Sequence, residues 1–390
     1  MLTRSAVEAW LAPRADEMAE LLTRLIAIDS ENPPGRELGR CARAVHEAMD
    51  VLGLGPDIVE LAPARELEEP SIVRGSVGDG PKLLYFHGHF DVVPAQDRRQ
   101  FTAERRDGKI IGRGSADMKG GIVSMLYGAA AARDLGLLGD GRIVLHLVCD
   151  EETGSVTAAG HLREAKLIDP RALAMVTAEP SGGKIWNSAR GALSLRVEVR
   201  GLEAHVGQAD RGVNAFQHML HIARPVENYA REMTAKGSRL VVGGLFGGGS
   251  NFNVVPGSAF FTVDGRYDPD EDLDRELDHL TAAVKEAAAE IGAKVSIEVT
   301  QRQPPAHTDA SHSAATALAE VVAEVEGEAR FEMCAGILET RWYSQLGIPA
   351  FGYGAGRLEV AHGPDEYVDE AAMRRCSAVY ALYAGRMFAA

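Results

Sequence analysis

The sequence predicts an α/β protein with a mostly parallel, mixed β-sheet flanked by helices and interrupted by a smaller inserted α+β domain. Three observations support this fold class. The chain has 390 residues, more than one hydrophobic core usually serves. Short apolar runs typical of strands alternate with helical patterns in its first and last parts, as in a parallel sheet covered on both faces. Near Gly183 this alternation gives way to longer strands and helices, which indicates a second domain.

The first part of the chain supplies the elements of the main domain in order. Apolar residues recur at helical spacing over residues 18–28, and this helix ends before the Asn-Pro-Pro-Gly segment at 32–35 because proline cannot continue it. The further expected elements are a helix at 38–52, strands at 71–77 and 82–86, a helix at 118–135, a strand at 142–149, a helix at 157–165 and a strand at 172–178.

The inserted domain is expected over residues 183–300. Its elements are a strand with alternating apolar residues at 192–200, a helix at 213–233, a glycine-rich stretch, a strand at 259–267, a helix at 271–291 and a strand at 294–300. The Arg-Gln-Pro-Pro segment at 302–305 is typical of a linker that returns to the main domain. Residues 1–182 and 301–390 therefore form the main domain in this prediction.

Composition argues against several classes of partner. The formal charge is -15, from 41 basic and 56 acidic residues, and no Lys/Arg block forms a patch for phosphates, so we expect no nucleic-acid partner. No apolar run reaches the roughly 20 residues of a membrane span. The N-terminal apolar pattern contains Glu8, Asp16 and Glu17, unlike a signal peptide, so we expect a cytoplasmic protein with no membrane partner. The four cysteines form no Cys-x-x-Cys pair, which argues against a thiolate zinc site.

Side chains that commonly bind metals follow three of the predicted strands. They are His89 and Asp91 after the strand at 82–86, Glu151 and Glu152 after the strand at 142–149, and Glu179 after the strand at 172–178. The carboxyl ends of parallel strands share one edge of a sheet, where ligands bind, so these side chains should converge. Asp117, which opens a helix between glycines, and His362, which follows a strand near 349–353, complete the set.

Taken singly, these residues have ordinary interpretations. His87, two residues before His89, is an alternative candidate for the histidine of this motif. The acidic run at 150–152 is typical of a solvated turn. Glu179 is suited to capping a loop, and Asp117 is suited to an N-cap. Several carboxylates in one cleft repel each other unless cations neutralise them, and a mixture of imidazole and carboxylate suits zinc. Their joint presence therefore predicts a site for a pair of divalent cations.

These motifs resemble those of the di-zinc metallopeptidase family that contains acetylornithine deacetylase, succinyl-diaminopimelate desuccinylase, glutamate carboxypeptidase and the aminoacylases. The resemblance runs from ENPPG near Asn32, through HGHFDVVP, GRGSADMKGG, DEETGS and AEPSG, to AHGPDEYV near His362. It implies a zinc-peptidase-like catalytic domain formed by the main domain, with the insertion acting as a dimerisation or lid domain.

The resemblance also implies the roles of the metal-type residues. Asp117 would bridge two Zn²⁺ per subunit, which Co²⁺ or Mn²⁺ can replace, with His89 and Glu179 on one ion and Glu152 and His362 on the other. The family has a cis peptide bond after the bridging aspartate, which is Asp117-Met118 in this chain.

Two further acids receive roles from the same resemblance. Asp91 would orient His89, as residues behind zinc ligands commonly do. Glu151 would be the general base that takes a proton from the attacking water and delivers it to the leaving nitrogen. No covalent intermediate is required.

In the inserted domain, the stretch GLEAHVGQADRGVNA resembles the family segment whose histidine reaches across a dimer to stabilise the oxyanion. This implies a homodimer in which His205 acts in trans. Histidines also occur at 218 and 221, so the ordinary interpretation of His205 is one of several histidines in this region without a special role. Asn253 and Arg266 match positions assigned to the substrate carboxylate, and their ordinary interpretations are a turn residue and a strand-end cation. Arg341 and Gly354 are further candidates for that pocket.

The predicted function is that of a zinc-dependent amidohydrolase that removes an acetyl, succinyl or similar group from an N-acyl amino acid. Within the family, a glutamate at position 179 goes with deacylases and carboxypeptidases. The alternatives are a metallo-carboxypeptidase or dipeptidase acting on a dipeptide-like substrate, and an inactive metal-binding protein, against which Glu151 argues. The sequence departs from the family pattern at Ala209, Glu339 and Tyr353, which concerns the substrate pockets rather than the metals.

Overall fold

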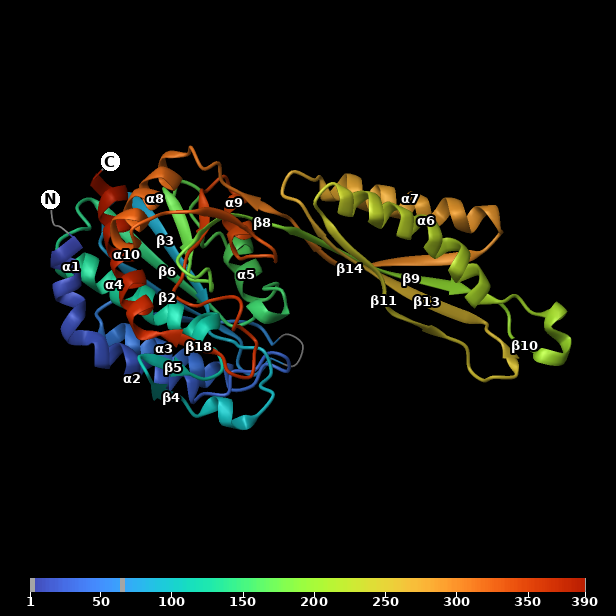
Figure 1. Ribbon diagram of the computed structural model, residues 1–390, viewed down its shortest axis with the longest axis horizontal. Coiled ribbons are helices and arrows are strands. Elements are labelled where there is room, and N and C mark those ends of the chain that lie inside the picture. The colour runs from blue at the N-terminus through green and yellow to red at the C-terminus, as the bar shows by residue number, and fades with distance from the viewer. Residues whose placement is uncertain (1–3, 64–66, 390) are drawn as a thin grey trace. The chain divides into compact units, whose positions relative to one another are not determined.

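A computed structural model describes residues 4–63 and 67–389 of the chain (Figure 1). The chain divides into two compact units. The first comprises the described residues up to Asn187 together with His307–Met333 and the described residues from Trp342 onward. The second comprises Ser188–Ala306 and Cys334–Arg341. The domain boundaries expected after residues 182 and 300 stay a prediction, and each unit is described by itself.

The first unit is built on a nine-stranded sheet with the strand order β1-β2-β6-β3-β7-β17-β8-β15, in which β16 also pairs with β8. Its strands are β1 (Asp57–Glu60), β2 (Ser71–Val77), β3 (Lys82–His89), β6 (Gly141–Val148), β7 (Ala174–Thr177), β8 (Ile185–Ala189), β15 (Ala306–His307), β16 (Phe331–Cys334) and β17 (Ala350–Gly352). The four central strands, β6, β3, β7 and β17, are parallel, whereas β2 runs antiparallel to its neighbours β6 and β1. The predicted fold class is therefore confirmed.

Helices cover both faces of this sheet. They are α1 (Arg4–Leu11), α2 (Ala15–Ile26), α3 (Leu38–Val51), α4 (Gly120–Asp134), α5 (Ala158–Glu164), α8 (Ser313–Glu326), α9 (Thr340–Ser344) and α10 (Glu370–Ala389). A small three-stranded sheet accompanies them, formed by β4 (Glu104–Arg106), β5 (Lys109–Ile111) and β18 (Tyr367–Asp369). No helix in residues 4–63 and 67–389 is both long and apolar enough to cross a membrane.

Strand register assigns side chains to the two faces. On one face, Phe86 packs edge-on against Tyr380 of α10, with ring centroids 4.7 Å apart. On the other face, Tyr85 and His146 contact Tyr343 of α9. Successive residues of a strand point to opposite faces, so both faces of the sheet pack against helices. The ends of the strands are left to carry ligands.

The buried Lys119 connects the turn that carries Asp117 to the end of helix α2. Its Nζ donates hydrogen bonds to the backbone oxygens of Leu25 and Ile28, at 2.9 and 3.0 Å. Burial lowers the pKa of this ammonium. Leu25 lies in the last turn of α2 and Ile28 just beyond it, and each carbonyl also accepts a backbone N–H, so Lys119 adds a second donor to each.

The second unit is a four-stranded antiparallel sheet of order β11-β13-β9-β14 with two helices on one face (Figure 1). Its elements are β9 (Gly191–Arg200), α6 (Ala215–Ala235), β11 (Arg239–Gly248), β13 (Ser258–Tyr267), α7 (Leu273–Glu290) and β14 (Lys294–Gln303). Leu193, Leu195 and Val197 alternate along β9 and are buried, as the sequence pattern predicts. A two-stranded ribbon, β10 (Ala204–His205) with β12 (Val254–Val255), completes the unit.

Several elements differ from expectation, by a missed strand or by their boundaries. The glycine-rich stretch after α6 contains a ten-residue strand, β11, that the sequence did not predict. β3 continues to His89 rather than ending at Phe86. β14 runs on to Gln303, within the expected linker, because its ladder with β9 continues past a register shift near residue 300.

Candidate metal centre

Five side chains singled out by the sequence lie together in the first unit. They form two groups that share Asp117: one with His89 and Glu179, the other with Glu152 and His362. Within each group, the potential ligand atoms all lie within 4.8 Å of one another. The structure thus brings five separate segments of the chain to one place.

The two oxygens of Asp117 face different groups. Oδ1 lies 3.2 Å from Nε2 of His89, and Oδ2 lies 3.3 Å from Nε2 of His362. On the outer sides, Oε1 of Glu179 is 3.9 Å from the His89 nitrogen and Oε1 of Glu152 is 3.4 Å from the His362 nitrogen. A carboxylate whose oxygens each point into a separate ligand set has the arrangement of a bridge between two cations.

The ends of the parallel strands position this cluster. His89 is the last residue of β3, Glu151 and Glu152 follow β6, and Glu179 follows β7. Asp117 lies in the turn Ser115–Lys119 before α4, where its φ of -126° and ψ of 99° depart from helical values. The expected cis peptide bond between Asp117 and Met118 is present.

Asp91 connects His89 to the turn that carries Glu151 and Glu152. Nδ1 of His89 lies 3.0 Å from the Asp91 backbone oxygen and 3.3 Å from Oδ1. The Asp91 carboxylate also accepts the backbone N–H groups of Glu151 and Glu152, at 3.2 and 3.1 Å, and the Asn32 amide donates to it at 2.9 Å. A proton held on Nδ1 leaves Nε2 of His89 available for a metal.

A second buried network joins Asp117 to His362 through Glu366. Oε1 of Glu366 accepts the backbone N–H groups of Ala116 and Asp117 at 2.9 and 3.1 Å. Its Oε2 accepts Nη1 of Arg113 at 2.5 Å, and Nη2 of Arg113 donates to the His362 backbone oxygen at 3.3 Å. Glu366 and Arg113 are buried, so one ion pair fixes the backbone on both sides of the cluster.

Electrostatics within the cluster favour positive charge. Hydrogen bonds to Asp117 and Glu152 raise the pKa of His362 to about 10. Burial disfavours the charged form of His89, but contacts with Asp117 and Asp91 outweigh it and raise the pKa of His89. Burial also opposes ionisation of Asp117, but hydrogen bonds from His362 and His89 lower its pKa below the usual range. The acids therefore stay ionised only where cationic partners face them.

These residues fit a pair of divalent cations. Three carboxylates and two imidazoles are a ligand mixture that zinc accepts, and two cations would neutralise the buried acids in place of protons on the imidazoles. His362 is half exposed, so the second group is open to solvent on one side. An open side is what a catalytic metal site needs for water and substrate.

Gly354, a candidate for substrate binding, packs against the segment that carries Glu179. A Cβ at this position would lie 2.3 Å from the Ala178 backbone oxygen and 2.4 Å from that of Glu179. The Gly354 N–H donates to the Ser181 hydroxyl at 3.0 Å. Only glycine permits this close approach, so Gly354 helps to place Glu179.

The structure brings His205 and Asn253 together in the second unit. His205 lies on β10, opposite Val254 of β12, and the Val206 N–H donates to the Asn253 backbone oxygen at 2.8 Å. Both side chains are exposed. Nδ1 of His205 accepts the Gly207 N–H at 3.1 Å, which leaves the ring proton on Nε2.

The two predicted arginines are not close to this pair. Arg266 lies near the end of β13, eight residues beyond its first residue Ser258, which corresponds to about 27 Å along a strand. Its Nη1 donates to Asp264 at 2.9 Å. Arg341 is buried, donates to Gln303 at 3.0 Å and lies 3.5 Å from Glu339. The assignment of Asn253, Arg266 and Arg341 to the substrate carboxylate stays a prediction.

Fold and cluster together define a protein whose sheet presents a candidate metal-binding cluster where its parallel strands end. The sequence pattern of peptidase family M20/M25/M40 matches residues 85–386. The chain therefore belongs to this family, which is metal-dependent. The predicted family, and with it the prediction of a hydrolase, is confirmed, whereas the bond and substrate are proposals.

Individual relatives are distant in sequence. The uncharacterised protein YgeY of Escherichia coli K12 is 27% identical over 208 residues, 52% of this chain and 48% of that protein. The match thus spans about half the length of this relative. Succinyl-diaminopimelate desuccinylase of Xanthomonas euvesicatoria is 27% identical over 276 residues, 66% of this chain and 69% of that protein.

A solved structure supports the fold. An M20 family metallo-carboxypeptidase from Sulfolobus solfataricus superposes with a TM-score of 0.79, covering 96% of this chain and 100% of that one. The sequence identity is 18%, so the likeness concerns the fold alone.

Sequence reasoning missed the residues behind the ligands. Asn32 lies in the Asn-Pro-Pro-Gly segment, which served as a helix stop and as a family motif but received no role at the metals, and Glu366 lies four residues after His362. Arg113 stands four residues before Asp117. Their proximity to motifs was a usable signal, but burial of an Arg–Glu pair is decided by tertiary packing, which local pattern does not report.

Replacing Glu366 tests the network that joins Asp117 to His362. Glu366→Gln removes the charge that holds Arg113 and weakens acceptance of the two backbone N–H groups, so we expect zinc affinity to fall about 10- to 100-fold. Competition with a chromogenic chelator measures it. Glu104→Gln, at an exposed acid paired with Arg106, is the matched control. Equal affinities in both variants would contradict the assigned role.

Metal binding should release protons. The pKa of His362 is raised to about 10, so without metal this imidazole is protonated at neutral pH and must lose its proton to become a ligand. Apparent zinc affinity should therefore rise with pH between about 6 and 8. Calorimetric titrations in buffers of different ionisation enthalpy measure the protons released. Binding heats that do not depend on the buffer would contradict this expectation.

Proposed function

We propose that the protein is a di-zinc amidohydrolase that removes an acetyl, succinyl or similar group from an N-acyl amino acid. The observation that carries the proposal is the arrangement of Asp117, whose two oxygens face two separate ligand groups. Co²⁺ or Mn²⁺ would also suit these ligands. His89 and Glu179 would hold one ion, and Glu152 and His362 the other.

The residues around the cluster divide the chemistry. When bound, a pair of zinc ions lowers the pKa of a water and polarises the substrate carbonyl. Glu151 follows the ligand-bearing strand β6, and the hydrogen bond from its N–H to Asp91 fixes its backbone. We assign it the task of accepting the water proton and passing it to the leaving nitrogen. Asp91 fixes the position of the His89 ring relative to the turn that carries Glu151.

His205 is proposed to stabilise the oxyanion that develops on the substrate. Because Nδ1 accepts the Gly207 N–H, Nε2 carries the proton and is a donor. The side chain is exposed, with Asn253 beside it, so both are available to a substrate. A donor aimed at developing charge commonly contributes about a hundredfold or more in rate. From the family resemblance, we propose that it serves the metal site of a second subunit.

A deacylase is preferred to a carboxypeptidase or dipeptidase for two reasons. Glu179, rather than an aspartate, stands at the outer position of the first group. Desuccinylases are among the relatives, at 27% identity over 276 residues. The second candidate function is a peptidase that uses the same chemistry, because a metallo-carboxypeptidase has the same fold.

A homodimer through the second unit is supported by the edge strand β11. β11 pairs only with β13 among the described strands, so its other side presents unpaired backbone groups. Residues 240–248 carry no charged side chain, and Phe246 and Val241 are 67% and 58% exposed. The opposite edge strand, β14, carries Lys294, Glu298 and Arg302, which guard against pairing.

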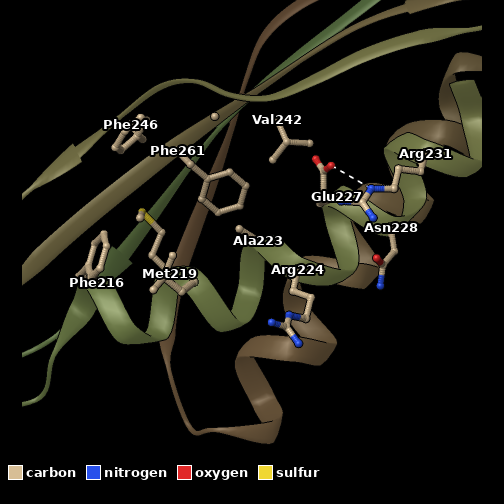
Figure 2. Close-up of a pocket in the computed structure, with 12 residues that line it drawn as sticks. Phe216, Met219, Ala223, Arg224, Glu227, Asn228, Arg231, Val242, Phe246 and Phe261 are labelled. Carbon is tan, nitrogen blue, oxygen red and sulfur yellow. Dashed lines mark hydrogen bonds and ion pairs between the residues drawn. The ribbon is translucent and has the colours of Figure 1, made fainter.

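The face of α6 beside β11 adds a groove to this surface, lined by apolar side chains and by Arg224, Glu227, Asn228 and Arg231. Figure 2 shows Phe216 and Met219 of α6 near Phe246 of β11 and Phe261 of β13. The groove has a volume of about 720 Å³, and Leu220 on its rim is 54% exposed. Exposed apolar side chains next to an open strand edge favour association of two copies by strand pairing and helix packing. The predicted cytoplasmic location stays a prediction.

Replacing the proposed base separates catalysis from metal binding. Glu151→Gln should lower kcat about 100- to 10,000-fold because proton transfer is lost, while zinc content stays at the wild-type value. Glu164→Gln, at an exposed acid that ends α5, is the matched control and should retain activity. Full activity in Glu151→Gln would show that another group is the base, and full activity with no metal would remove the proposed mechanism.

A substrate panel tests the reaction. The zinc-loaded protein should hydrolyse N-acetyl or N-succinyl amino acids with kcat/KM at least about tenfold above that for dipeptides, a difference of about 1.4 kcal/mol in transition-state stabilisation. Release of the free amino acid, followed by mass spectrometry, is the readout. Turnover of dipeptides alone would favour the second candidate, and no turnover of either class would favour a metal-binding protein.

The edge strand can be blocked by one charge. Val241→Lys places like charges at the proposed strand pairing and should give monomers in sedimentation velocity, whereas Val299→Lys on the opposite edge should leave the dimer intact. If His205 acts in trans, the monomeric variant should bind zinc but lose turnover. A wild-type monomer, or a dimer unaffected by Val241→Lys, would contradict the proposed interface.

A further inference from the structure

A small cationic pocket lies on one face of the first unit's sheet. It has a volume of about 260 Å³ and is lined by β1, β2, β3, β6 and the segment after α5. Its cations are Arg74 on β2, Arg142 on β6 and Lys166 after α5. The floor includes Tyr85, which belongs to the face opposite α10.

Strand register explains why the two arginines face one pocket. Arg74 pairs with His146, and Arg142 lies four residues before His146 on β6, so both side chains project from the same face. Four residues correspond to about 13 Å along the strand. Each arginine side chain is long enough to cover about half of that distance, so the two guanidinium groups can meet one small ligand between them.

Both arginines have a buried donor that no described residue satisfies. Nε of Arg74 and Nε of Arg142 are inaccessible to solvent and have no hydrogen-bond partner among the described residues. Buried donors are almost always paired, and a charged donor without an acceptor is costly. Solvent does not reach these two nitrogens, so a ligand in the pocket would meet the Nη groups of the two partly exposed arginines instead.

The charge balance identifies the kind of acceptor. Asp169 is also at the pocket, but Arg171 neutralises it at 2.6 Å. This leaves three cations, Arg74, Arg142 and Lys166, facing one further acid, Asp57. The excess of two positive charges suits a dianion. A guanidinium can bind an oxyanion through its two Nη N–H groups, as two parallel hydrogen bonds.

We propose that this pocket binds a tetrahedral oxyanion, phosphate or sulfate, held between Arg74 and Arg142 with Lys166 at its rim. Tyr85 is already engaged at the floor, since its hydroxyl accepts the Asp169 N–H at 2.8 Å. Arg142 is the second residue of β6, whereas Glu151 follows the last, so the site is distinct from the metal cluster at the opposite end of that strand. It does not rest on the proposed hydrolysis.

Binding of sulfate to the zinc-loaded protein tests the proposal. Calorimetric titration at constant ionic strength should show a site whose Kd rises at least about tenfold in Arg142→Gln and is undetectable in Arg74→Gln/Arg142→Gln. Arg106→Gln removes one positive charge from an exposed side chain on β4 and should bind sulfate as the wild type does. Sulfate held at the metal cluster would be equally affected by Arg142→Gln and Arg106→Gln.

Equal affinities in Arg142→Gln and Arg106→Gln, or no sulfate or phosphate binding by the wild type at millimolar concentration, would overturn the proposal. Arg142→Lys keeps the charge without the planar fork and should bind at least about threefold more weakly than the wild type. Circular dichroism of each variant confirms that the fold is kept. In crystals soaked with selenate, the anomalous signal should lie between Arg74 and Arg142, and selenate at the metal cluster alone would contradict the site.

Discussion

The buried carboxylate of Asp117 is the constraint on which the metal centre depends. Its two oxygens lie 3.2 and 3.3 Å from two different imidazoles, with Glu179 and Glu152 on the outer sides. So many acids in one place are stable only when positive charge is held among them. The same acids raise the pKa values of His89 and His362, because a protonated imidazole supplies positive charge beside them. A bound metal would displace these protons. Metal binding and the stability of this edge of the sheet are therefore linked.

Two hydrogen-bonded supports hold the ligands in place. Asp91 joins His89 to the backbone of the Glu151 turn, and the Glu366–Arg113 pair joins the backbone of Asp117 to that of His362. Each support is buried and ionic, so losing one partner leaves a charge without compensation. The two units divide the remaining work. The first holds the cluster, and the second offers His205 and an open strand edge. The cationic pocket of Arg74 and Arg142 is separate from the metal cluster and from His205, and we propose it as an anion site.

Much of the site was predictable from the sequence because its residues follow strand ends. His89, Glu152 and Glu179 come after apolar runs, and parallel strands necessarily bring those positions to one edge. The strand β11 was missed because its glycines obscure alternation, although pairing with β13 stabilises it. Arg266 could not be separated from Asn253 by pattern, since only the length of β13 shows that they lie far apart. The burial of Arg113 and Arg341 also depends on packing rather than on local sequence.

The central claim is that Asp117 bridges two cations. Anomalous diffraction from crystals of the zinc-loaded protein, collected on both sides of the zinc absorption edge, tests it most directly. The account predicts two peaks per chain, about 3.5 to 4 Å apart, one between His89 and Glu179 and the other between Glu152 and His362. A single peak that uses only one oxygen of Asp117, or zinc bound elsewhere in the first unit, would contradict it.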